Sequence, residues 1–168
     1  GTPTLKLAND HRPPLTPPAA VAIVGLGALG LPIAVNLRRA GYRLNVHTRS
    51  RSAESAAELL DDQGPTVTSS SSPGKATEGC GVLLICVSDD AAVQDVLWGD
   101  NGAGFALAPG SLVIDCSTIA PATAAAMATR LAERNVHYID TPVTGGTEGA
   151  KAGTLTVLCG GDTMALEQ

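Results

Sequence analysis

The chain has 168 residues, 44% hydrophobic and 16% charged, which suffices for one packed domain and excludes a wholly disordered polymer. Eleven basic against sixteen acidic residues leave a net charge of −5, which argues against a nucleic-acid-binding surface. Because no apolar stretch approaches the ~18 residues that a membrane helix needs, we expect no membrane span.

Four cysteines, at positions 80, 86, 116 and 159, lie far apart without a C-x-x-C pair or a histidine at ligand spacing. We therefore expect no metal site, since a structural zinc ion needs clustered ligands. Each cysteine is interpreted as a small buried hydrophobe. Free thiols fit a reducing compartment and no signal peptide is visible, so the sequence predicts a cytoplasmic protein.

Residues 1–18 contain five prolines and no periodic apolar face, so we expect an extended, poorly ordered leader there. Across residues 19–168, short apolar runs alternate with helical patterns, which is typical of βαβ units. The expected strands are 19–24, 42–46, 66–68, 82–87, 112–115, 136–140 and 154–159. The expected helices are 29–40, 52–61, 89–97 and 121–134, with a loop at 101–110. This order predicts an α/β fold with a doubly wound, mostly parallel sheet.

A glycine motif stands between the first strand and the first helix. Residues 25–30 read G-L-G-A-L-G, the G-x-G-x-x-G spacing of a dinucleotide-binding loop. Gly25 permits the tight turn, Gly27 lets the backbone approach a pyrophosphate, and Gly30 lets the helix pack closely on the sheet. The free amides and dipole of the helix N-terminus would then hold the phosphates. The predicted cofactor contacts are therefore Gly25, Leu26, Gly27, Ala28, Leu29 and Gly30.

The end of the second strand should contact the adenosine ribose. The sequence there runs from His47 through Thr48, Arg49 and Ser50, without the Asp or Glu that an NAD-preferring site would place to accept from the ribose hydroxyls. The planar guanidinium of Arg49 suits a 2′-phosphate instead. We therefore predict that Thr48, Arg49 and Ser50 contact the cofactor, which favours NADP and leaves NAD as the alternative.

Two later segments leave strand ends on the same sheet edge, where open α/β sheets bind ligands. Residues 115–118 read D-C-S-T, and residues 140–146 read D-T-P-V-T-G-G. Their hydroxyls and paired glycine amides would form a cradle for a small carboxylate.

Together these motifs resemble the N-terminal, Rossmann-type domain of the β-hydroxyacid dehydrogenases. That superfamily includes 3-hydroxyisobutyrate dehydrogenase, tartronate semialdehyde reductase and, more distantly, 6-phosphogluconate dehydrogenase. Residues 25–30 match its G-L-G-x-M-G with Leu29 for Met, residues 115–118 match D-x-S-T, and residues 140–146 match D-x-P-V-S-G-G with Thr144 for Ser. The resemblance implies the following contacts: Ser117, Thr144, Gly145 and Gly146 with substrate, and Thr118, Val87 and Ser88 with the nicotinamide end of the cofactor.

The resemblance also implies an activity, hydride transfer between NADP(H) and a small β-hydroxyacid or its semialdehyde. In the family the catalytic lysine lies on a long helix after this domain, in a G-x-x-x-K-x-x-x-N pattern. That pattern does not occur before Gln168, and Lys151 is interpreted as a solvated loop residue. We therefore expect a chain without the family's C-terminal helical domain and without a catalytic residue, which binds cofactor but turns over little.

Two alternatives stay open. One is an imine-reducing relative, which would share this domain. The other is a non-catalytic module that binds a dinucleotide with this domain alone. The expected partner is a small carboxylate substrate, with no nucleic acid and no membrane. Because the family's usual subunit interface is built from the helices of its C-terminal domain, a homo-oligomer would belong to the full-length protein.

Overall fold

The structure, a computed structural model, describes residues 18–48 and 66–140 in full. It also describes the backbone of four strands at residues 4–7, 143–144, 155–159 and 162–167. In chain order, the elements of the main body are β2 (Ala20–Val24), α1 (Gly30–Arg39), β3 (Arg43–His47), β4 (Val67–Ser69), α4 (Pro73–Thr77), β5 (Val82–Ile85), α5 (Asp90–Trp98), α6 (Ala103–Ala106), β6 (Leu112–Asp115), α7 (Pro121–Ala132) and β7 (His137–Asp140).

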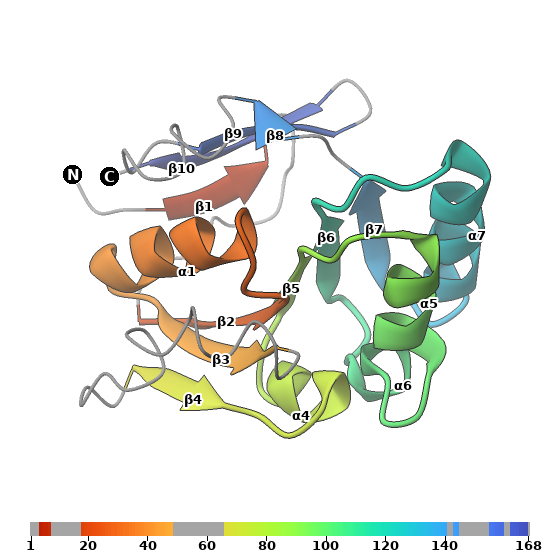
Figure 1. Cartoon of the computed structure of the whole chain (residues 1–168), viewed down its shortest axis with the longest axis horizontal. Coiled ribbons are helices and arrows are strands. Elements are labelled where there is room, and N and C mark those ends of the chain that lie inside the picture. The colour runs from red at the N-terminus through yellow and green to blue at the C-terminus, as the bar shows by residue number, and fades with distance from the viewer. Residues whose placement is uncertain are drawn as a thin grey trace.

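Six parallel strands form the main sheet in the order β4-β3-β2-β5-β6-β7 (Figure 1). Counted from β2 along the chain, this is the 3-2-1-4-5-6 order of a doubly wound dinucleotide-binding sheet. The order reverses between β2 and β5, so the loops that follow these two strands diverge and leave a crevice at the carboxyl edge. The doubly wound parallel fold expected from the sequence is confirmed.

Alternate side chains of each central strand enter two separate cores. On one face, Ile23 and Leu84 pack with Ile33 and Leu37 of helix α1. On the other face, residues such as Leu83 pack with the apolar sides of α4, α5, α6 and α7. Strands buried on both faces read as continuous apolar runs, which is why β2, β5 and β6 are visible in the sequence.

A second, antiparallel sheet has the order β1-β10-β9-β8, with β1 (Thr4–Leu7), β8 (Val143–Thr144), β9 (Leu155–Cys159) and β10 (Asp162–Glu167). It lies beyond helix α1 in Figure 1. Residues 4–7 of the expected poorly ordered leader form strand β1, in which Thr4 pairs with Glu167 and Leu7 with Met164. Strand β10, also absent from the expected elements, supplies that pairing edge.

Two other expectations meet different outcomes. The expected loop at 101–110 contains the short helix α6, so that expectation is wrong for residues 103–106. Its Gly104 packs so tightly that a Cβ there would lie 2.4 Å from the Trp98 ring, and this tertiary contact outweighs the poor helix propensity of glycine. The expected helix at 52–61 lies outside the described residues.

Candidate dinucleotide-binding site

The glycine loop connects β2 to α1 at the point where the strand order reverses. Gly25 has φ +101°, and a Cβ there would lie 2.1 Å from the carbonyl oxygen of Cys86, which directly follows the neighbouring strand β5. A Cβ on Gly30 would lie 1.9 Å from the carbonyl oxygen of Gly25. Both glycines are therefore required by the loop's own packing and backbone, whether or not a ligand binds.

Gly27 differs from its two neighbours in the motif. A Cβ built there meets no atom within 4 Å, and its φ is not in the left-handed region. Neither packing nor backbone conformation explains a glycine at this exposed position. The role predicted from the sequence, close approach of a pyrophosphate to the backbone, would account for it, since a side chain would occupy that space.

Helix α1 presents an uncompensated N-terminus to this space. Its N-cap residue Leu29 provides no side-chain hydrogen bond, and its first turn contains no acidic residue. By contrast, α4 is capped by Ser72 and α5 by Asp89, whose side chains accept from backbone amides of their own helices. The positive dipole end of α1 favours an anion beside the glycine loop, although the first turn offers few free amides, since the Leu31 amide donates to the Gly27 carbonyl and Pro32 has no N–H.

Hydrogen bonds fix the loop to the end of β3. The backbone amide of Gly25 donates to the carbonyl oxygen of His47 at 2.9 Å, and the amide of Leu26 donates to Thr48 Oγ1 at 3.4 Å. The segment expected to contact the ribose is thus attached to the segment expected to hold the phosphates. Thr48, predicted as a cofactor contact, also has this structural role.

The loops after β5 and β6 are joined in the same way. Ser117 Oγ accepts from the backbone amide of Val87 at 2.9 Å, and the amide of Ser117 donates to Asp115 Oδ1 at 2.9 Å. Ser117 is 6% exposed, so the hydroxyl that the resemblance assigns to substrate lines the site while holding the β5 loop. Thr118, one residue further on, is exposed.

Asp115 is completely buried and anchors this turn from below. Besides the Ser117 amide, it accepts from the hydroxyl of Tyr138 on β7 at 2.6 Å. Burial raises the pKa of the Asp115 carboxyl above its usual value, although these hydrogen bonds oppose the shift. Burial and the Asp115 carboxylate likewise raise the pKa of Asp140 and of the Tyr138 hydroxyl. The motif at residues 115–118 predicts no separate role for Asp115, because only the pairing of β6 with β7 brings Tyr138 to it.

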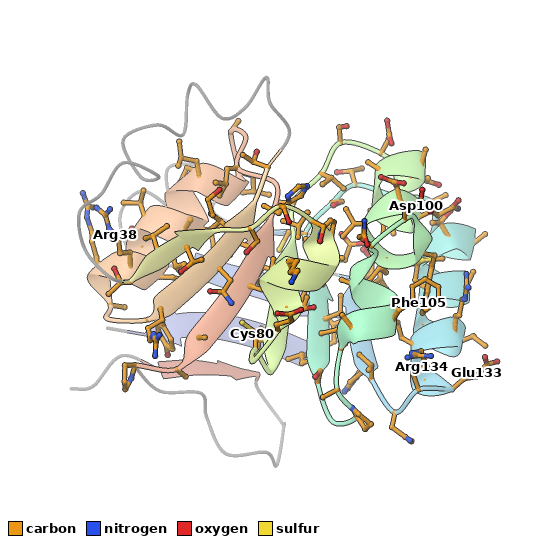
Figure 2. All side chains as sticks on the ribbon, turned by 90° about the horizontal axis from the view of Figure 1, so that it is seen from below. Arg38, Cys80, Asp100, Phe105, Glu133 and Arg134 are labelled. Carbon is orange, nitrogen blue, oxygen red and sulfur yellow. The ribbon has the colours of Figure 1, made fainter. Side chains whose placement is uncertain are left out.

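A cavity of about 640 Å³ lies between these loops, within the range of small-molecule and cofactor sites. Ten of the predicted residues line it: Gly25, Leu26, Gly27, Ala28, Leu29, Thr48, Val87, Ser88, Ser117 and Thr118. Gly30 does not line the cavity; it packs closely against the backbone of Gly25. The cavity is also lined by residues that the sequence motifs did not predict, namely Val24, His47, Ser71, Ser72, Pro73, Cys86, Asp95, Val96, Asp100, Asn101 and Cys116. Of these, Asp100 follows the end of α5 (Figure 2).

Several predicted site residues lie beyond this description. Arg49, Ser50, Gly145 and Gly146 are outside the described residues, and Thr144 is described only by its backbone in β8. Among the described helices, none has the length and apolar character needed to cross a bilayer. Nor does the described part of the chain gather three His, Cys, Asp or Glu side chains as a metal site would require.

Comparison with known proteins identifies this architecture. Residues 20–168 match the family model of the NAD-binding domain of 6-phosphogluconate dehydrogenase. The chain is 40% identical over 148 residues to the NAD-dependent L-serine dehydrogenase of Pseudomonas aeruginosa, covering 88% of this chain and 48% of that protein. It is 36% identical to the 2-hydroxy-3-oxopropionate reductase of Escherichia coli, again over 148 residues, covering 88% and 49%.

A solved structure agrees with this assignment. Psf3 in complex with NADP+ and 2-OPP superposes with a TM-score of 0.73 at 35% identity, covering 83% of this chain and 48% of that one. The chain therefore spans about half the length of the curated relatives it matches. From the matching family model, the sequence identity and the strand order together, the chain belongs to the β-hydroxyacid dehydrogenase superfamily and corresponds to its N-terminal NAD(P)-binding domain.

Proposed function

We propose that this chain is the NADP-binding domain of an oxidoreductase that transfers a hydride between NADP(H) and a small β-hydroxyacid or its semialdehyde. The observation that carries the proposal is Gly27, whose missing side chain leaves open space at the mouth of a cavity of about 640 Å³. The uncapped N-terminus of α1 at the same place supplies the matching charge.

A nicotinamide dinucleotide would extend across the site from the glycine loop toward the ends of β5 and β6. Residues 25–29 and the start of α1 would hold the pyrophosphate, and Thr48, Arg49 and Ser50 would lie by the adenosine ribose. Val87, Ser88 and Thr118, beyond the ends of β5 and β6, would lie by the nicotinamide. When bound, the cofactor supplies hydride chemistry, and this chain's residues supply its position.

Arg49 is the basis for favouring NADP over NAD. A guanidinium offers a rigid fork of donors to a phosphate, and no acidic residue stands at positions 47–51 to accept from a ribose 2′-hydroxyl. The relatives differ in cofactor: one is named as NAD-dependent, and Psf3 is complexed with NADP+. We assign NADP on the residues of this chain.

The substrate end is proposed on the same basis. Ser117, Thr144, Gly145 and Gly146 would contact a small carboxylate, as the names of the relatives, which are enzymes of serine and of small hydroxyacids, support. We assign no residue of this chain to proton transfer, because Lys151 does not stand in the family's lysine pattern. We also place the protein in the cytoplasm, on the basis of its free cysteines.

The test is a calorimetric titration of the chain with NADPH and NADH side by side. Arg49→Ala should weaken NADPH binding by about 1.5–3 kcal/mol, or roughly 10- to 150-fold, and leave NADH nearly unchanged, because one charge-assisted phosphate contact is lost. Arg39→Ala is the matched control, since Arg39 is exposed in the last turn of α1, at the end away from the glycine loop. Equal losses for both cofactors would contradict the assignment of Arg49, and no binding of either cofactor would contradict the proposed function.

A further inference from the structure

Two cysteines lie side by side at the carboxyl edge of the main sheet. Strands β5 and β6 pair in parallel with Ile85 opposite Asp115, so the next residues, Cys86 and Cys116, occupy equivalent positions just beyond the ladder. The amide of Cys116 still donates to the carbonyl oxygen of Ile85 at 2.8 Å, which keeps this register. Side chains at equivalent positions of paired strands point to the same face of the sheet. Cys116 accordingly belongs to the core cluster under α1, and Cys86 packs against that cluster.

The geometry is compatible with a covalent link between them. Neighbouring strands lie about 4.8 Å apart, within the 4.4–6.8 Å between Cα atoms that disulfides span. The neighbouring Cys86 thiol and burial both raise the pKa of the Cys116 thiol well above its usual value. Cys80, Cys86 and Cys116, the cysteines whose side chains are described, form no disulfide in this structure.

Both residues are among those that line the proposed cofactor cavity. Cys86 is half-buried and Cys116 is 7% exposed, so a small solute in the cavity meets Cys86 first. Cys86 also supports the glycine loop: its carbonyl oxygen would lie 2.1 Å from a Cβ on Gly25, and its own Cβ would lie 3.2 Å from one on Gly30. Any shift of Cys86 toward Cys116 would therefore move atoms against which Gly25 and Gly30 of the glycine loop pack.

We propose that Cys86 and Cys116 form a reversible dithiol–disulfide site that reacts with hydroperoxides in the cavity and competes with dinucleotide binding. The coupling to dinucleotide rests on the proposed function, whereas the disulfide itself does not. Because Cys86 packs against Gly25 and Gly30, oxidation of the pair would change the packing beneath the glycine loop and so link the redox state of the surroundings to cofactor binding.

The reaction balances with a hydroperoxide as the two-electron oxidant. The Cys86 sulfur attacks the peroxide, so that an S–O bond forms, the O–O bond breaks and water or an alcohol leaves with the thiol proton. The Cys116 sulfur then attacks the sulfenic sulfur, so that the S–S bond forms, the S–O bond breaks and a second water leaves with the remaining proton. Two thiols are oxidised to one disulfide while the peroxide is reduced. A thiol reductant reverses the change.

The first experiment detects the bond directly. The chain is treated with hydrogen peroxide, its remaining thiols are blocked with N-ethylmaleimide, and its peptides are mapped by mass spectrometry with and without dithiothreitol. We expect a peptide pair linked through Cys86 and Cys116 that dithiothreitol separates. Cys86→Ala and Cys116→Ala should each abolish it. Cys80→Ala should retain it, because Cys80 precedes β5 and lies at the opposite end of that strand (Figure 2).

The second experiment measures the rate of disulfide formation with NADP+ present, with occupancy verified by calorimetry. At ten times its Kd, NADP+ leaves about a tenth of the chains empty, so the bond should form about tenfold more slowly. Recovery of both cysteines as blocked thiols, or pairing of Cys86 with a different cysteine, would overturn the disulfide. An unchanged rate with NADP+ bound would overturn the competition. If the chain binds no NADP+ but still forms the bond, the proposed function and the competition fail while the disulfide stands.

Discussion

Replacing Gly27 separates ligand binding from folding more sharply than any other change in the loop. A Cβ at this position meets no atom within 4 Å, and the φ angle is one that other residues adopt. Gly27→Ala and Gly27→Val should therefore change the free energy of unfolding by no more than about 0.5 kcal/mol, as for an ordinary surface substitution. In the complex, however, the new side chain would occupy the space into which the pyrophosphate must approach.

The expected loss of affinity follows from the contacts that the loop would make. A hydrogen bond from a backbone amide to a charged phosphate oxygen contributes about 1.5–3 kcal/mol. If the valine side chain displaces two such contacts, binding weakens by at least about 3 kcal/mol, or more than about 100-fold in Kd. The loss should be the same for NADPH and NADH, because the pyrophosphate is common to both.

The measurement combines calorimetric titration with urea unfolding of each variant. Gly81→Ala is the matched control, because Gly81 is also exposed, also meets nothing at its Cβ and precedes β5 at the opposite sheet edge. Gly25→Ala is the contrasting variant: with φ +101° and a Cβ only 2.1 Å from the Cys86 carbonyl, it should lose more than about 2 kcal/mol of stability. Full NADPH affinity in Gly27→Val would refute the assignment of the phosphate site to this loop.

Three further changes test the frame around the cavity. Burial raises the pKa of Asp115, so the folded chain keeps this proton to higher pH than the unfolded chain, and the free energy of unfolding falls as pH rises above about 4. In urea unfolding measured over a series of pH values, Asp115→Asn should remove this part of the pH dependence. An unchanged pH dependence would contradict the reasoning. Asp90 accepts from the amide of Ala120 and from the hydroxyl of Thr123 at 2.7 Å, so Asp90→Ala should cost about 1–2 kcal/mol in thermal unfolding, with the exposed Glu133→Ala as the neutral comparison. Thr48→Val removes the acceptor of the Leu26 amide and should weaken binding of both dinucleotides several-fold. Calorimetric titration would detect this loss, once urea unfolding has shown that the variant is as stable as the parent chain. Unchanged binding would mean that Thr48 does not help to place the loop.

The sequence predicts the main sheet well because each central strand is buried on both faces. The apolar runs at β2, β5 and β6 leave little ambiguity, and the glycine motif marks the start of α1. The same argument fails for short elements held by tertiary contacts. Helix α6 forms where glycine and proline indicated a loop, because Gly104 fits under the Trp98 ring. Strand β1 (Thr4–Leu7) forms within a proline-rich segment because it pairs with the edge of β10.

The site is only partly encoded in local motifs. A glycine pattern predicts the loop, but it does not distinguish glycines required by packing from glycines available to a ligand. The atoms that surround a Cβ built at each glycine make this distinction: Gly25 and Gly30 have close contacts, whereas Gly27 has none. Pairs such as Asp115 with Tyr138 are separated by 23 residues and meet only through the register of adjacent strands. Cys86 and Cys116, interpreted separately as small hydrophobes, meet in the same way.

The carboxyl edge of a parallel sheet therefore concentrates chemistry that no single segment contains. Neighbouring strands lie about 4.8 Å apart, and the residues that follow each strand meet at this edge. A site there is therefore assembled from several short segments that are far apart in the sequence. This explains why the cavity includes both the residues that the motifs predict and a thiol pair that they do not. The same spacing that would let the residues after β5 and β6 contact one cofactor would let Cys86 and Cys116 form one bond.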